Sequence, residues 1–122
     1  MKKAFVETRV FTAQAKQRLN DGDYRQLQNE LMANPEKGTP MPGCGGLRKL
    51  RVADPSRGKG KRGGVRVIYL NIPEAHRIDL IAIYGKDEKD DLSHDEKRVL
   101  RRLAEEARAE AIAAFRRSGK RK

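Results

Sequence analysis

The sequence predicts an α+β domain in which a small antiparallel sheet packs with two N-terminal helices and a long C-terminal helix. Three observations carry this prediction. Apolar residues recur at helical spacing up to Asn34, at alternate positions between Leu47 and Tyr69, and again at helical spacing after Ser93. A length of 122 residues suits one domain, so we expect residues 1–122 to fold as a single unit.

The N-terminal third is expected to contain one strand followed by two helices. Ala4–Val10 alternates weakly between polar and apolar residues, which favours a strand, and Phe11–Leu19 then repeats apolar residues at helical spacing. A second helix is predicted from the Asn20–Asp23 turn to Asn34, because Pro35 disfavours helical backbone in the residue before it.

Residues 38–46 separate this helical part from a strand-rich part. Glycine and proline make up six of these nine residues, so we expect a loop that is neither helix nor strand. The polarity then alternates with a period of two in Leu47–Val52 and in Val65–Tyr69, and Arg77–Tyr84 is apolar at nearly every position. These patterns predict a three-stranded meander, added to the N-terminal strand, whose last strand is covered on both faces.

A long C-terminal helix is predicted from Ser93. Ser93 and Glu96 have the spacing of a capping box, in which each side chain accepts a hydrogen bond from a free N–H group of the first turn. An apolar stripe runs from Val99 to Phe115, and it would pack on the sheet. Residues 118–122 are polar, and we expect them to form a frayed tail.

The charge of the chain is strongly positive and concentrated in one segment. There are 28 Lys and Arg against 17 Asp and Glu, a formal net charge of +11. Residues 47–72 alone hold eight Lys or Arg and one acid. Such a focused excess suits a polyanion, so nucleic acid is the leading partner class, and a basic face that only contacts solvent is the alternative.

Several other classes of protein lack the residues that they need. Cys44 is the only cysteine, which excludes an intrachain disulfide and a cysteine-rich zinc site and favours a reducing, cytoplasmic location. His76 and His94 are expected at a turn and at a helix start, not in a catalytic pair, a triad or a metal site. We therefore expect no metal and no other cofactor. The apolar runs are too short for a membrane helix.

Gly58–Gly63 forms a glycine-rich basic loop between two predicted strands. It matches a dinucleotide-binding pattern by letter, but that pattern requires a helix after it, and a strand is predicted there. Its glycines let the backbone approach a phosphate closely while Lys59, Lys61 and Arg62 supply charge. We interpret the segment as a phosphate-binding loop, with a solvated hairpin loop as the alternative.

Further cations are predicted on neighbouring strands. Lys49 and Arg51 share one face of their strand, Arg66 lies on the next strand, and Tyr84 and Lys86 end the last one. If these strands are adjacent, four cations and a tyrosine crowd one face, and mutual repulsion would lower the pKa of a lysine so that it could act as a base. The alternative is that these side chains only solvate a sheet edge and prevent aggregation.

A family resemblance lies in three segments, Gly45–Arg51, Gly58–Tyr69 and Ile83–Lys86. Together they closely resemble HigB toxins of the RelE/ParE superfamily, and the similarity extends from Phe5–Thr8 to the helix entry at Asp91-Leu92. The resemblance implies a RelE-like fold and a toxin that enters the ribosomal A site and cleaves mRNA there. It also implies a HigA-like, DNA-binding antitoxin that holds the toxin inactive.

By motif match, the resemblance implies a catalytic set, and the basic residues around it supply an RNA-binding set. The catalytic set is Lys49, Arg51, Arg66, Tyr84 and Lys86. The RNA-binding set is Arg48, Lys59, Lys61 and Arg62. The sequence departs from the founding RelE branch because Asp87 follows Lys86 and no tyrosine occurs beyond Tyr84, so the identities of the general base and the general acid stay open.

The expected reaction is metal-independent cleavage of RNA, in which a base deprotonates a ribose 2′-OH that attacks the adjacent phosphate and leaves a 2′,3′-cyclic end. Arg66 would stabilise charge on the phosphate. Lys49 or Lys86 would be the base, and Tyr84 would stack on a nucleobase or orient a proton. Two alternatives remain: a ParE-like inhibitor of DNA gyrase, and an RNA- or DNA-binding module that leaves its ligand uncut.

Overall fold

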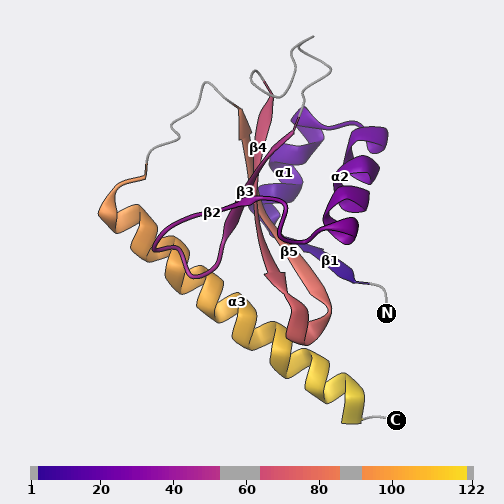
Figure 1. The fold of residues 1–122 in the computed structure, drawn as a ribbon, viewed down its shortest axis with the longest axis vertical. Helices are drawn as coiled ribbons and strands as arrows, with labels where there is room; N and C mark the ends of the chain where they lie inside the picture. The colour runs from indigo at the N-terminus through magenta and orange to yellow at the C-terminus, as the bar shows by residue number, and fades with distance from the viewer. Residues whose placement is uncertain (1–2, 53–63, 86–91, 121–122) are drawn as a thin grey trace.

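The computed structural model describes residues 3–52, 64–85 and 92–120 (Figure 1). The elements along the chain are β1 (Ala4–Glu7), α1 (Arg9–Arg18), α2 (Asp21–Ala33), β2 (Thr39–Pro40), β3 (Arg48–Val52), β4 (Val65–Ile72), a 3-10 turn (Pro73–Ala75), β5 (Arg77–Gly85) and α3 (His94–Lys120). They form three layers, in which α1 and α2 cover one face of a sheet and α3 crosses the other face (Figure 1). The predicted α+β class is confirmed.

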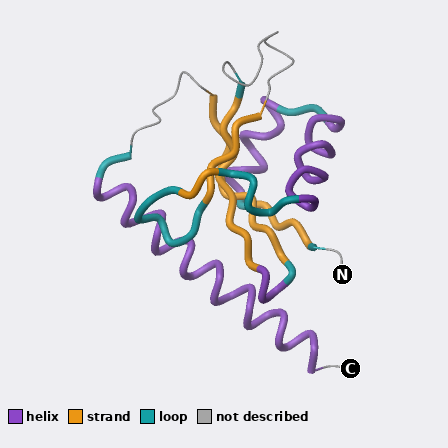
Figure 2. Tube along the Cα trace, viewed as in Figure 1, coloured by secondary structure: helices purple, strands orange, loops and turns teal. Residues whose placement is uncertain are grey.

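The sheet has five strands in the order β1-β5-β4-β3-β2. Antiparallel pairing joins β3, β4 and β5 as the predicted meander, and Figure 2 shows these strands between the two helical layers. In contrast, β1 pairs with β5 in parallel, from Ala4 opposite Arg77 to Glu7 opposite Leu80. Because β5 has a neighbour on each side, it is an inner strand, as its nearly continuous apolar sequence predicts.

Two apolar clusters, one on each face of the sheet, hold the layers together. Leu27 and Leu31 of α2 pack in one cluster with Val67 of β4. Ala104 of α3 packs in the other cluster with Ile68, the next residue of β4. Successive side chains of a strand point to opposite faces, so β4 contributes to both clusters and lies at the centre of the core.

Side-chain caps begin the three helices. At the start of α3, Ser93 Oγ accepts a hydrogen bond from the Glu96 amide at 3.1 Å, and Glu96 Oε1 accepts one from the Ser93 amide at 2.8 Å. Asn20 and Asp23 form the same reciprocal pair before α2, and the Thr8 side chain caps α1. Both helix starts predicted from capping residues are therefore confirmed.

The structure differs from the sequence prediction at two boundaries in the first half. Val10 is helical, although we expected it in the opening strand, because the Thr8 cap begins α1 at Arg9. The expected loop contains a short strand, since Thr39-Pro40 pairs with Arg48 and Lys49 of β3. Pro40 is tolerated because β2 is an edge strand, where one row of backbone N–H groups has no partner strand.

The structure describes only part of the predicted C-terminal tail, and its fraying stays a prediction. Residues 118–120, which we predicted as part of a frayed tail, continue α3, while 121 and 122 lie outside the described residues. Two contacts hold the second half of α3 near the β4–β5 connection. The Phe115 ring lies 5.3 Å from the His76 ring, and Arg77 forms an ion pair with Glu110 at 2.9 Å.

Candidate functional site

A row of three polar side chains crosses the meander near one end of its strands. Arg51 of β3 pairs with Arg66 of β4, and Arg66 pairs with Tyr84 of β5. Directly opposite residues of antiparallel strands project from the same face, with Cβ atoms about 5 Å apart. The register therefore confirms the predicted alignment of these strands, and we call this set the Arg51–Arg66–Tyr84 row.

The row lies on the face of the sheet that α3 covers. Arg66 is two residues from Ile68, which packs in the cluster containing Ala104 of α3, and side chains two positions apart share a face. Lys49 pairs with Ile68 and therefore lies on this face too. Four of the five predicted catalytic residues, namely Lys49, Arg51, Arg66 and Tyr84, are thus brought to one face of adjacent strands.

The end of the sheet near the row is also where the chain continues into two segments that carry further predicted site residues. Val65 pairs with Val52 of β3 and with Gly85 of β5, one position beyond the row. Residues 53–63 connect β3 to Gly64, and residues 86–91 follow Gly85. Lys59, Lys61, Arg62 and Lys86 fall in these two segments and lie outside the described residues.

Arg66 is the most buried cation of the row, with 5% of its surface exposed. Its guanidinium Nη1 donates a hydrogen bond to the Gly64 carbonyl at 3.2 Å. A carbonyl oxygen neutralises no charge, and no carboxylate within residues 3–52, 64–85 and 92–120 forms an ion pair with Arg66. Since a cation removed from water without a counter-charge is costly, an anion bound at this place would be stabilised.

The other members of the set differ in how much solvent they contact. Arg51 is exposed, whereas Lys49 and Tyr84 are half-buried. The exposed guanidinium of Arg51 is one strand away from the buried guanidinium of Arg66, so the row presents two positive charges at different depths. Guanidinium groups bind phosphate oxygens through paired N–H donors, which makes this arrangement suited to a phosphodiester.

A groove of about 460 Å³ lies beside the row, between the sheet and the first turns of α3. Tyr84 and Ile68 form the sheet side, and Val99 and Leu100 form part of the helix side. Its lining is mostly apolar, with carboxylates from Asp95 and Glu96 as the exception; the full lining is Met41, Ile68, Tyr84, Leu92, Asp95, Glu96, Val99 and Leu100. The capping box reveals where α3 begins, but nothing in the sequence indicates that its first turns border Tyr84.

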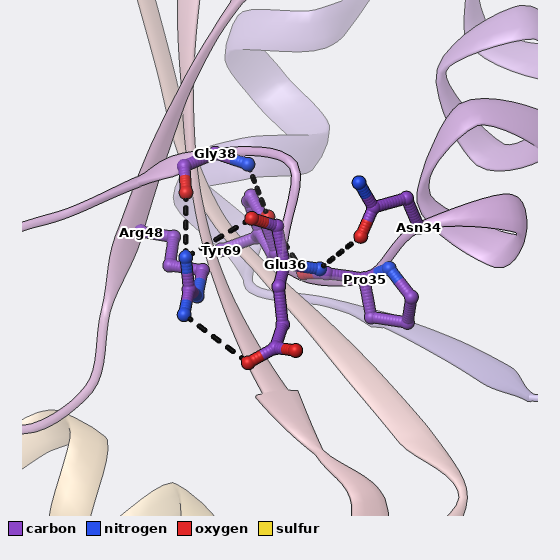
Figure 3. A network of polar contacts seen from close by, with 6 residues as sticks. All are labelled: Asn34, Pro35, Glu36, Gly38, Arg48 and Tyr69. Atoms are coloured by element: carbon purple, nitrogen blue, oxygen red, sulfur yellow. Dashed lines mark hydrogen bonds and ion pairs between the residues drawn. The ribbon is translucent and has the colours of Figure 1, made fainter.

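Arg48 lies apart from the row, although the sequence placed it in the RNA-binding set. It pairs with Tyr69, which packs in the cluster on the opposite face of the sheet. Its Nη1 donates hydrogen bonds to the Gly38 carbonyl at 2.7 Å and to the Glu36 carbonyl at 3.1 Å (Figure 3). An ion pair of 3.5 Å with the Glu36 carboxylate completes this set of contacts. In this structure Arg48 therefore ties the segment after α2 to β3.

Histidines and metal-ligand clusters are not part of the described site. His76 caps the 3-10 turn between β4 and β5 with a positive φ of 48°, and His94 begins α3. Within the described ranges, no three His, Cys, Asp or Glu side chains gather closely enough to hold a metal ion. The chemistry that the row itself offers is charge stabilisation by cations, with a phenol beside them.

The same described ranges contain no helix that is both long enough and apolar enough to cross a membrane.

Comparison with known proteins identifies one family. Residues 3–120 match the family described as RelE toxin of the RelE/RelB toxin–antitoxin system. Among solved structures, the chain is similar to the isolated E. coli RelE toxin in its P21 crystal form, with 18% identity and a TM-score of 0.47 over 83% of this chain and 98% of that one. The match to the family covers nearly the whole chain, so this protein belongs to the RelE toxin family, the toxins of toxin–antitoxin systems, and an antitoxin is its partner.

Proposed function

We propose that this protein is a HigB-type toxin that cleaves mRNA in the ribosomal A site. The observation that carries the proposal is the Arg51–Arg66–Tyr84 row, in which the buried Arg66 has no carboxylate partner among the described residues. The scissile phosphate of RNA would supply the missing negative charge. Because translation takes place in the cytoplasm, this function also assigns the protein to that compartment.

The proposed reaction uses the RNA's own 2′-hydroxyl as nucleophile. A base removes the 2′-OH proton, O2′ attacks the adjacent phosphorus in line, and the bond from phosphorus to O5′ breaks. An acid donates a proton to O5′, so the products carry a 2′,3′-cyclic phosphate and a 5′-OH. Arg66, with Arg51 beside it, would stabilise the charge that grows on the phosphate oxygens, and the proposed step needs no metal ion. DNA lacks the nucleophile and would stay intact.

The proton transfers are assigned to residues around Arg66. Lys49 shares the face of the row and is the first candidate for the base, and Lys86, next in the chain after Gly85, is the second. Tyr84 is directly opposite Arg66 and lines the groove, so it is suited to stack on a nucleobase or to orient a proton. Lys59, Lys61 and Arg62 would bind the RNA backbone.

The experiment that tests this proposal is a purified translation reaction in which new mRNA 5′ ends are mapped by primer extension. We expect wild-type protein to cut translated message, and Arg66→Ala and Arg51→Gln to lose on the order of a hundredfold in rate, as for loss of one charge-stabilising donor. Arg25→Gln is the matched control, because Arg25 is an exposed cation on α2 across the sheet. Thermal unfolding of each variant verifies folding, and Arg51 is exposed enough for its loss to leave the core intact.

Other outcomes of the same reaction would favour the alternatives. Cleavage of free mRNA would remove the dependence on the ribosome. If message stays intact with wild-type protein, a DNA supercoiling assay distinguishes a ParE-like gyrase inhibitor from a passive binder. The inhibitor blocks gyrase at low protein excess, whereas a passive binder shows only salt-dependent affinity for nucleic acid.

The antitoxin is proposed to be a HigA-like, DNA-binding protein that covers or distorts the cationic face. Co-expression with the neighbouring open reading frame should yield a complex in which mRNA cleavage is suppressed. If the purified complex cleaves translated message as fast as the free toxin, the inhibitory role of that partner is wrong.

A further inference from the structure

Two more hollows continue from the groove beside Tyr84 along the start of α3. The second hollow, of about 500 Å³, shares Met41 and Leu92 with the groove and is lined by Lys49 and Lys97. The third hollow, of about 340 Å³, shares Pro42 and Lys97 with the second. The three hollows therefore adjoin through shared lining residues, and their linings run from Tyr84 of the row to Arg101 of α3.

The character of the lining changes along this path. The groove is mostly apolar and carries the carboxylates of Asp95 and Glu96, whereas the third hollow is lined by Lys97, Arg98 and Arg101 together with His94. Lys97 and Arg101 are four residues apart on α3 and so project from the same side of the helix. Neither forms an ion pair with a carboxylate of the described residues.

Two carboxylates and a histidine lie in the first turns of α3, close in sequence to these cations. Asp95 lies 3.6 Å from Arg98, but both side chains are largely exposed, and such surface pairs contribute little. Glu96 accepts the hydrogen bond from the Ser93 amide that caps the helix, and His94 lines the third hollow. Lys97 is half-buried and lines both the second and the third hollow, so it is the cation that these two hollows share.

The wall opposite α3 is fixed in place by tight packing. At Gly45, where φ is +70°, an added Cβ would lie 3.1 Å from both the Ala104 Cβ and the Arg101 carbonyl oxygen. Arg108 Nη1 donates a hydrogen bond to the Gly45 carbonyl at 3.1 Å, and Cys44 is buried under the same segment. The β2–β3 loop is thereby held on α3, so the second and third hollows exist before any ligand binds.

We infer that these hollows form a track for single-stranded RNA that flanks the cut. One phosphate would bind at Lys97 in the second hollow and the next at Arg101 in the third, while a base of the nucleotide at the row would enter the groove beside Tyr84. The inference rests on the proposed function and extends its RNA contacts from the sheet to α3. Asp95 and Glu96 repel anions from the groove but accept hydrogen bonds from the amino groups of bases, so the groove suits a base and the cationic hollows suit the phosphates that follow it.

The test compares two double variants of α3 with equal loss of charge. Lys97→Gln/Arg101→Gln removes the cations of the track but keeps the aliphatic stem of Arg101 that packs at Gly45. Arg116→Gln/Arg117→Gln is the control, because both arginines are exposed near the far end of the same helix. The probe is a fluorescent single-stranded RNA with 2′-O-methyl groups, which cannot be cut, and fluorescence anisotropy gives its Kd at several salt concentrations.

We expect the track variant to bind the RNA on the order of tenfold more weakly than wild type at low salt. The magnitude of the slope in a plot of log binding constant against log salt concentration should fall by about 1.4, the value for two lost phosphate contacts on a single strand. The control should stay within about twofold of wild type. In the translation reaction, cleavage by the track variant should fall together with binding.

Three results would overturn the track. The first is that both double variants bind RNA with equal affinity although wild-type protein cleaves translated message. That result would overturn the track but leave the proposed function unchanged. The second is a track variant that keeps RNA affinity but loses binding to the antitoxin, which would make the hollows a protein-docking surface. The third is wild-type protein that neither binds the probe nor cleaves translated message, in which case the proposed function and the track fail together.

Discussion

The hydroxyl group of Tyr69 joins β4 to the segment that follows α2. It accepts a hydrogen bond from the Gly38 amide at 2.9 Å and donates one to the Pro35 carbonyl at 2.7 Å (Figure 3). The ring packs so closely that a Cβ added at Gly38 would lie 2.8 Å from it. Burial raises the pKa of Tyr69, so the phenol stays protonated and can donate and accept at once.

Removal of this hydroxyl should destabilise the fold. In Tyr69→Phe the buried Gly38 amide loses its partner, and an unsatisfied buried donor costs about 1–3 kcal/mol in the free energy of unfolding. Urea unfolding followed by circular dichroism measures the change. Tyr24→Phe serves as the control, because the Tyr24 hydroxyl bonds the exposed Glu7 carboxylate, and its loss should cost less. Equal losses would show that the Tyr69 hydroxyl bonds contribute no more than a surface contact.

Two glycines of the β2–β3 loop provide a matched pair of backbone tests. Gly43 and Gly45 have similar positive φ values of +74° and +70°, but only the added Cβ at Gly45 would meet Ala104 and Arg101. Gly43→Ala should therefore lower the free energy of unfolding by about 1 kcal/mol, the strain of an alanine in the left-handed backbone conformation. Gly45→Ala should cost about 1–3 kcal/mol more, because close packing against α3 adds overpacking. Equal melting temperatures of the two variants would contradict the fixed wall beside α3.

Attachment of α3 to the sheet depends on a charged cluster as well as on apolar packing. Arg77 donates to both oxygens of the buried Asp79 carboxylate, from Nε at 2.6 Å and from Nη2 at 3.0 Å. Its Nη1 lies 2.9 Å from Glu110 Oε2 on α3. The bond to Asp79 is the main cause of a raised pKa at Arg77, so the cation is strongly held between sheet and helix.

Neutralising the two carboxylates should have unequal effects. Asp79→Asn leaves a mostly buried guanidinium without its main counter-charge, and breaking such a pair costs about 3 kcal/mol. The Glu110 side chain is 59% exposed, so Glu110→Gln should cost less than about 1 kcal/mol. Chemical denaturation of both variants measures the difference. A larger loss from Glu110→Gln would place the anchoring interaction on the helix surface instead of in the sheet.

The sequence predicts elements better than it predicts their partners. The period of two in β3 and β4 indicates which residues share a face. The short β4–β5 connection makes adjacent antiparallel strands the expected arrangement. The alignment of Arg66 with Tyr84 can therefore be predicted from the sequence pattern alone. The same period of two places the neighbouring residues Arg48 and Lys49 on opposite faces of β3. The hydrogen-bond partners of Arg48 at Glu36 and Gly38 come from tertiary packing, and no local pattern encodes them. The same is true of strand β2 and of the groove between the sheet and α3.

At the scale of the whole molecule, the positive charge exceeds what the structural contacts use. Arg48 and Arg77 form hydrogen bonds within the fold, whereas other Lys and Arg residues line the row and the hollows of α3. The net charge of +11 is therefore available to attract a polyanion over a distance, and salt should weaken that attraction.

Global stability should fall in alkaline solution. Burial is the main cause of a raised pKa at both Tyr24 and Tyr69, whereas the unfolded chain ionises its tyrosines near the ordinary value of 10.0. Above that pH the unfolded state has lost protons that the native state keeps, so the free energy of unfolding decreases as pH rises. Thermal melts between about pH 9 and 11 measure the decrease. The slope should flatten in Tyr24→Phe/Tyr69→Phe, and an unchanged slope would assign the effect to other groups.

The parallel pairing of β1 with β5 has a consequence for the order of folding. The Thr8 hydroxyl bonds the Ile81 carbonyl across 73 residues of sequence, while the β4–β5 hairpin closes through a turn of a few residues. Long loops cost more entropy to close and slow the formation of the contacts that they join. During synthesis, β1 leaves the ribosome long before β5 exists, so the nascent N-terminus waits unpaired until the meander that carries the row has been made. Pulse-labelling hydrogen exchange during refolding should accordingly show amide protection in β4 and β5 before protection in β1.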